Sequence, residues 1–164
     1  MALRPLTNEG WGFSSNCFVC EPANASGLRI PFFHDDEAGT VVADFRLGPE
    51  FSGAPTYVHG GVVLAVLDEA QAWATIAVGG RFAVTTETTT RFLRPARVGR
   101  DYRVEARLTA THGDDLATAA TVSDERGRPC AESTATFRAL SAAAAVDAIG
   151  SDISGTPDAD YLRD

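Results

Sequence analysis

A histidine, two glycines and an aspartate are spaced in a way that could act on a carbonyl group. His59, Gly60 and Gly61 open a long apolar stretch, and Asp68 lies nine residues after the histidine. Glycines that open a helix leave backbone N–H groups free beside the positive end of its dipole, and a carbonyl oxygen can approach them closely. An oxyanion site requires such donors. Asp68, among apolar neighbours, is expected to be desolvated, with a raised pKa that suits a general base.

Each of these residues has an alternative role. Asp68 can be a buried structural acid that accepts hydrogen bonds from the backbone. Glu69 projects about 100° further around the helix and is the second candidate for the base, or else a salt-bridged or interface residue. His59 fits an orienting group better than a proton carrier, because a helix N-terminus disfavours its charged form.

The element that must position these residues is one long helix over residues 60–78, ended by Gly79 and Gly80. Its polar residues from position 62 onwards are only Asp68, Glu69, Gln71 and Thr75. A helix at the surface has a polar face over about half of its circumference. This helix must therefore be covered on most sides.

The segments expected to cover the helix are strands. Residues 101–111 alternate between apolar and polar side chains, as a half-buried strand does. Consecutive strands joined by short turns form an antiparallel meander. We predict an α+β architecture in which a curved antiparallel sheet of about six strands wraps the helix, with strands over residues 28–33, 40–47, 82–93, 101–111, 116–123 and 130–140.

Length and charge exclude several classes of protein. The 164 residues suffice for one domain and its core. With 14 basic and 22 acidic residues the net charge is −8, which argues against binding to nucleic acid or to anionic membranes. All basic residues are arginine, and without lysine neither a Walker-A phosphate loop nor Schiff-base chemistry is available.

The chain divides into three segments: an N-terminal segment at 1–27, the main domain at 28–140 and an acidic tail at 141–164. The tail has few large apolar side chains and is expected to be flexible. No apolar run is long enough for a signal peptide or a membrane span. We therefore expect a cytoplasmic protein.

The pattern as a whole resembles the hotdog-fold acyl-CoA thioesterases, in particular the phenylacetate-pathway thioesterase and its mammalian mitochondrial relatives. The resemblance covers roughly residues 16–140. It rests on His59-Gly60-Gly61 with the acid nine residues after the histidine, on the meander with Arg94-Pro95-Ala96, and on Cys17-Phe18-Val19-Cys20 followed by Gly27-Leu28. It implies the hotdog fold, a long central helix wrapped by the sheet.

The resemblance also implies roles for individual residues. Asp68 matches the catalytic carboxylate, as general base or nucleophile, and Gly60 and Gly61 match the donors that polarise the thioester carbonyl. His59 matches the helix-opening histidine, and Thr85 the Ser or Thr that positions water or substrate. Donors and acid come from different subunits in such enzymes, which implies a homodimer or a homotetramer with shared active sites.

One position departs from the pattern. Some relatives have an Asn six residues before the histidine, whereas this chain has Gly53 at that position. Thr85 also lies in a threonine-rich run that strand propensity alone explains.

Arginines gather in residues 91–107 of this acidic chain. Guanidinium groups bind phosphate in a bidentate manner, and coenzyme A presents phosphates at its exposed end. Arg94 or Arg97, in a turn, and Arg91 nearby are the candidates for binding it; the alternative is a set of solvated strand edges and turns.

Three cysteines do not suggest a disulfide framework. Cys17 and Cys20 form one CxxC, but no second pair of ligands stands at the spacing of a zinc site, and the βαβ context of a redox motif is missing. Packing is the preferred role. We therefore expect no metal. We also expect no cofactor, because a thioester is already activated for hydrolysis.

The leading hypothesis is hydrolysis of an acyl-CoA to free acid and coenzyme A. The alternatives are hydrolysis of acyl-carrier-protein thioesters and a protein on the same fold that binds an acyl-CoA or acyl chain without turnover. A dehydratase or hydratase is a further alternative, since hotdog folds host those too, but its motif is not found. The acyl group itself is not specified by the sequence.

Overall fold

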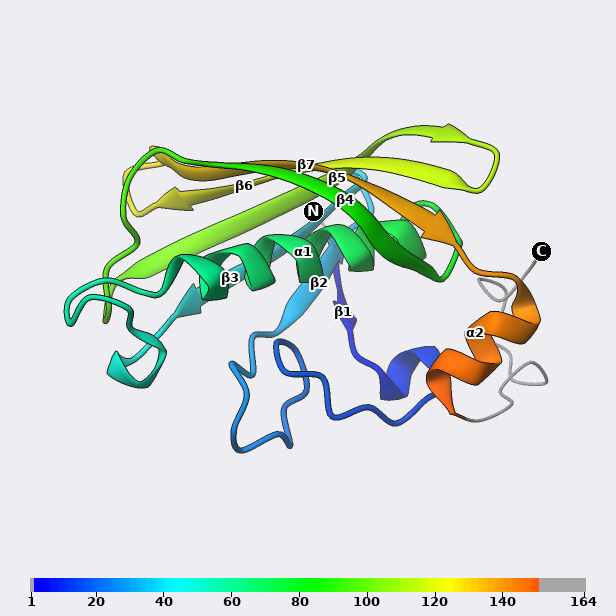
Figure 1. Ribbon diagram of the computed structural model, residues 1–164, viewed down its shortest axis with the longest axis horizontal. Helices are drawn as coiled ribbons and strands as arrows, with labels where there is room; N and C mark the ends of the chain where they lie inside the picture. Colours follow the sequence, from blue (N-terminus) through cyan, green and yellow to red (C-terminus); the bar gives the residue numbers. More distant parts are fainter. Residues whose placement is uncertain (1, 151–164) are drawn as a thin grey trace.

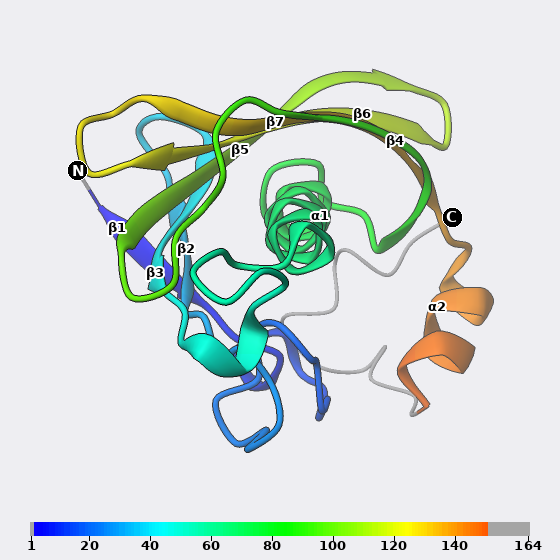
Figure 2. The same ribbon diagram turned by 60° about the vertical axis from the view of Figure 1, so that its left-hand side comes forward.

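Helix α1 (Gly60–Ala77) runs along the concave face of one antiparallel sheet, which curves over it in both views (Figures 1 and 2). The computed structural model describes residues 2–150. The sheet has seven strands in the order β1-β2-β3-β5-β6-β7-β4. Their bounds are β1 Leu3–Leu6, β2 Phe32–Asp35, β3 Thr40–Arg46, β4 Ala83–Phe92, β5 Asp101–His112, β6 Asp115–Asp124 and β7 Pro129–Ala139. Short 3-10 helices occupy Glu9–Trp11 and Pro49–Phe51.

The wrapped helix and the α+β hotdog architecture confirm the prediction from sequence. Val66, Leu67, Ala70 and Ala74 of α1 are fully buried against the sheet. Burying one Val or Leu side chain contributes about 1.5–3 kcal/mol, so burial of this face stabilises the position of the helix. In β5 the buried residues Tyr102, Val104 and Ala106 alternate with exposed ones, as the pattern predicted.

Strand β4 contains a β-bulge between Thr85 and Glu87. Its partner β7 keeps a regular alternation, with Phe137 opposite Thr85 and Ala135 opposite Thr88. Because the bulge adds one residue to β4 only, both threonines face the helix although three positions separate them. Within residues 2–150, β4 pairs with β7 on one side and leaves its other edge open.

The N-terminal segment contributes to the fold more than expected. β1 is a seventh strand, paired with β2, and the segment passes across the side of α1 opposite β4–β7 (Figures 1 and 2). Leu6, Val19 and Cys20 are buried in the main core. β1 escapes sequence analysis because it is short, mostly exposed and contains Pro5, which is tolerated at a sheet edge.

The first part of the expected flexible tail is instead helix α2 (Ala142–Ile149). Ser141 accepts a hydrogen bond from the N–H of Ala144 at its start, and Gly150 ends it with a left-handed φ of 83°. Ala145 is fully buried. Residues 151–164, the rest of that predicted tail, lie outside the described residues. None of the helices in residues 2–150 is long and apolar enough to cross a membrane.

Candidate active site

The N-terminus of α1 offers one free hydrogen-bond donor rather than two. His59 is the N-cap, and its Nδ1 accepts the N–H of Gly61 at 2.9 Å. Within the described residues the N–H of Gly60 has no acceptor, and Gly60 is exposed. The ring of His59 therefore caps the helix at its N-terminus. Of the two expected carbonyl donors, Gly60 is the one left available.

Asp68 and Thr85 meet at the open edge of the sheet. The hydroxyl of Thr85 donates to Oδ1 of Asp68 at 2.6 Å, a short charge-assisted hydrogen bond. Oδ2 of Asp68 has no hydrogen-bond partner in residues 2–150. Asp68 is half-buried in the single chain and Thr85 is exposed. The two residues, predicted separately from the resemblance, thus come together from α1 and β4.

The donor and the acid of one chain are too far apart to act on the same carbonyl. Gly60 and Asp68 are eight residues apart on one helix, which corresponds to about 12 Å along its axis. A carbonyl oxygen bound to the N–H of Gly60 lies within hydrogen-bond distance of that nitrogen, so the acid that faces it must come from elsewhere. The N–H of Gly60 and the carboxylate of Asp68 in one chain therefore cannot act together on one carbonyl group.

A cavity of about 500 Å³ opens beside the free donor of Gly60. Its lining is mostly apolar and includes Val63, Phe92, Leu93 and Pro95. A Cβ atom added to Gly60 would lie 3.9 Å from the ring of Phe92, in ordinary contact. Gly53 also lines this cavity and lies against His59. The space suits an apolar chain that ends at the helix N-terminus.

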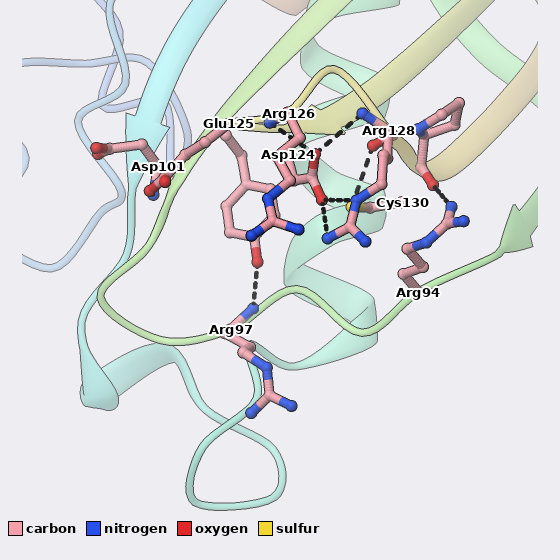
Figure 3. Close-up of polar contacts among 10 residues, drawn as sticks. Arg94, Arg97, Asp101, Asp124, Glu125, Arg126, Arg128 and Cys130 are labelled. Atoms are coloured by element: carbon pink, nitrogen blue, oxygen red, sulfur yellow. Dashed lines mark hydrogen bonds and ion pairs between the residues drawn. The ribbon is translucent and has the colours of Figure 1, made fainter.

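A second cavity, of about 410 Å³, adjoins the first and shares Arg94, Pro95 and Cys130 with it. Its charged lining residues, most of which Figure 3 labels, come from the β4–β5 and β6–β7 connections and from the adjoining ends of β5 and β6. Five are basic and three are acidic: Arg94, Arg97, Arg100, Arg126 and Arg128, with Asp101, Asp124 and Glu125.

Two of these acids are already paired with arginines. Asp101 forms an ion pair with Arg46 at 2.7 Å, and Asp124 with Arg128 at 2.8 Å. Hydrogen bonds from the backbone and side chain of Arg128 lower the pKa of Asp124. The remaining arginines of the cavity form no ion pair within residues 2–150. Because their guanidinium groups are available, the cavity is suited to an anion.

Of the three predicted arginines, Arg94 and Arg97 line the charged cavity and Arg91 does not. Arg94 donates from Nη1 to the carbonyl of Pro129 at 2.7 Å, and the guanidinium of Arg97 lies 5.2 Å from the ring centroid of Tyr57. The backbone N–H of Arg97 donates to the Tyr102 hydroxyl (Figure 3). Arg91 instead lines a separate surface hollow, cross-strand from Glu132. Sequence reasoning missed Arg126 and Arg128 because they join the cluster only through the β6–β7 turn.

Glu69, the second candidate base, faces away from Thr85 towards the N-terminal segment. The Cys17 thiol donates to Oε1 of Glu69 at 3.2 Å. Burial raises the pKa of Glu69 to about 8. A hydrogen bond with Cys20 lowers the pKa of Cys17 to about 5, and the same bond raises the pKa of Cys20.

Comparison with known proteins identifies the family. The sequence model of the thioesterase superfamily matches residues 56–131, which include α1 with Asp68 and the turn that holds Arg94 and Arg97. A thioesterase superfamily protein of known structure is 25% identical, with a TM-score of 0.72, over 84% of this chain and 68% of that chain. No curated protein matches the sequence.

Two further structures extend the comparison. A Ralstonia eutropha protein described as related to phenylacetic acid degradation is 30% identical, with a TM-score of 0.62, over 71% of this chain and 89% of that chain. A Streptococcus pneumoniae thioesterase solved with coenzyme A is 16% identical, with a TM-score of 0.60, over 62% of this chain and 82% of that chain; this likeness concerns the fold alone. The predicted resemblance is confirmed: the chain belongs to the thioesterase superfamily.

Proposed function

We propose that the protein hydrolyses an acyl-CoA thioester to the free acid and coenzyme A. The observation that carries the proposal is the short hydrogen bond from Thr85 to Asp68 on a helix whose N-terminal donor at Gly60 is free. Membership of the thioesterase superfamily supports it.

In the proposed reaction the N–H of Gly60 binds the thioester oxygen and stabilises the negative charge that develops there. His59 keeps that donor in place by capping the helix through Gly61. Thr85 holds Oδ1 of Asp68, and the free Oδ2 either takes the proton of an attacking water or attacks the carbonyl carbon itself. In the first route the C–S bond breaks and the proton taken from water passes from Asp68 to the departing thiolate. In the second route the thiolate leaves behind an acyl–Asp68 anhydride, which water hydrolyses to the free acid and the Asp68 carboxylate, and the thiolate takes up the proton released.

Coenzyme A is the proposed carrier of the acyl group because the two cavities are adjacent. The apolar cavity ends at Gly60 and suits an acyl chain, and the arginine-lined cavity beside it suits phosphates. Arg94 lies where the two meet, while Arg97 presents a guanidinium with no carboxylate partner in residues 2–150. The Streptococcus pneumoniae thioesterase, which has a related fold, was solved with coenzyme A, and this supports coenzyme A as the carrier. Arg91, in its separate hollow, is left out of it.

A second copy of the chain is proposed to complete each site. The open edge of β4 exposes Val84, and Phe92 and Leu93 are exposed at its end. An edge strand with unpaired backbone groups readily pairs with another chain. Pairing two β4 strands would bring Asp68 of one chain towards Gly60 of the other, as the 12 Å separation requires.

The experiment is release of free thiol from a panel of short-chain, long-chain and aryl acyl-CoAs, with an acyl-carrier-protein thioester as comparison. We expect turnover with some acyl-CoAs. Tight binding of an acyl-CoA without release of thiol would overturn the proposal and favour a binding protein. Turnover of the carrier-protein thioester alone would reject coenzyme A as the carrier.

Replacing Thr85 with valine keeps the shape of the side chain and removes the hydroxyl that holds Asp68. A hydrogen bond to a charged group contributes about 1.5–3 kcal/mol, so kcat is expected to fall about 10- to 100-fold with little change in KM. Thr85→Ser keeps the hydroxyl and should retain most of the activity. Equal losses in both variants would mean that the hydroxyl is not what matters at this position.

A further inference from the structure

Three side chains that can bind a divalent metal meet where the N-terminal segment contacts α1. They are the Cys17 and Cys20 sulfur atoms and the Glu69 carboxylate, which lie within 4.8 Å of one another. The cysteines come from the N-terminal segment and the glutamate from α1, so the cluster joins two parts of the chain that are far apart in sequence. Sequence analysis counted only cysteines and histidines and therefore missed the third ligand.

Hydrogen-bond donors point at both sulfur atoms. The backbone N–H groups of Val19 and Cys20 point at the Cys17 sulfur, at 3.4 and 3.5 Å. The buried side-chain amide of Asn8 donates to the Cys20 sulfur at 3.9 Å. Donors of this kind surround metal-bound cysteines and hold them in orientation. In residues 2–150, no ion pair with an arginine or histidine forms at Glu69, so the cluster has no positive charge of its own.

The spacing of the ligands fits zinc. Zinc binds cysteine sulfur at about 2.3 Å and carboxylate oxygen at about 2.0–2.2 Å in a tetrahedron, which places the ligand atoms about 3.5–4 Å apart. The sulfur of Cys17 and Oε1 of Glu69 are 3.2 Å apart, and the whole cluster spans no more than 4.8 Å. Small side-chain rotations therefore suffice to centre an ion among them.

We propose that Cys17, Cys20 and Glu69 form a zinc site that fastens the N-terminal segment to α1. When Zn²⁺ binds, the protons that the two thiols and the Glu69 carboxyl group carry are released to solvent, and the ion's two positive charges meet two thiolates and one carboxylate. A water molecule takes the fourth position. The site lies one residue from Asp68 in sequence, and a metal held there fixes the turn of α1 that carries it. This proposal is independent of the proposed hydrolysis.

The test is Co²⁺ uptake by the full-length protein after treatment with a chelator and a thiol reductant. We expect one Co²⁺ per chain, with the sulfur-to-cobalt absorption and the intense visible bands of tetrahedral thiolate coordination. Zn²⁺ should displace the colour. Cys17→Ser/Cys20→Ser should abolish it, and Glu69→Gln should weaken Co²⁺ binding at least tenfold.

Cys130→Ser is the matched control, since Cys130 is also buried but lies in β7, where its thiol donates to the Arg128 carbonyl. That variant should bind one Co²⁺ with wild-type affinity. Circular dichroism checks that every variant folds. X-ray absorption of the zinc-loaded wild type needs no variant and should show two sulfur ligands at about 2.3 Å.

Several results would overturn the proposal. They are no Co²⁺ uptake by the reduced wild type, sulfur-to-cobalt absorption that survives loss of both cysteines, and unchanged affinity in Glu69→Gln. A Cys17–Cys20 disulfide that forms in air, with no metal bound after its reduction, would show that the pair is a redox pair instead.

Discussion

Replacing Asp68 with asparagine is expected to lower kcat on the best acyl-CoA by about 10²–10⁴-fold, because an amide can neither accept the proton of water nor attack a carbonyl as a carboxylate does. Asparagine has nearly the same shape and can still accept the hydrogen bond from Thr85. The affinity for the substrate should therefore change little. Thiol release gives kcat, and calorimetric titration with a non-hydrolysable acyl-CoA analogue gives the affinity.

The matched control for this variant is Asp44→Asn. Asp44 lies on β3, is exposed and pairs with Arg103 at 3.1 Å, away from the helix N-terminus and both cavities. The Asp44→Asn variant should leave kcat unchanged. A kcat within threefold of wild type for Asp68→Asn would refute the assignment of Asp68 and turn attention to Glu69, the other acid on this turn.

Placing lysines on the open edge of β4 is expected to separate the proposed dimer and remove most of the activity. Val84 and Thr89 are exposed in the single chain, so Val84→Lys/Thr89→Lys should leave the fold intact. Lysines on an edge strand oppose pairing with a second strand. The mass in solution should fall to that of one chain, and kcat/KM should fall at least a hundredfold, because each chain carries only half-sites.

Light scattering coupled to size-exclusion chromatography measures the mass, and thiol release measures the activity. The control is Val84→Thr/Thr89→Ser, which adds no charge and keeps residue types that strands accept. It should remain a dimer and active. A monomeric lysine variant with full activity would contradict the shared site, whereas a lysine variant that is still a dimer would place the interface elsewhere.

The sequence predicts the part of the fold that depends on long periodic segments. The apolar helix after Gly60-Gly61 and the alternation in residues 101–111 both depend on burial over many residues, and the structure confirms them. Helix α2 was missed because its small side chains bury little area, although Ser141 and Gly150 are ordinary signals for a helix start and end. Greater attention to these caps would have found it.

At the candidate site, too, the sequence predicts some features and not others. The order of residues along one helix was enough to nominate Gly60 and Asp68, whose catalytic roles stay predictions. That His59 occupies the N–H of Gly61 depends on the rotamer of one side chain, which no pattern specifies. The meeting of Glu69 with Cys17, 52 residues away, depends on how the N-terminal segment crosses the helix. Such contacts follow from the packing of the whole chain.

The bulge in β4 has an evolutionary consequence. Thr85 faces Asp68, and Thr88 and Thr90 face Ser133, only because the strand holds one residue more than its partner between them. Deleting that residue would restore regular pairing but turn one half of the strand over, and either Asp68 would lose its hydroxyl or Ser133 its neighbours. Lineages of this protein should therefore gain and lose residues freely at the β5–β6 turn near Gly113, while the length of β4 stays constant.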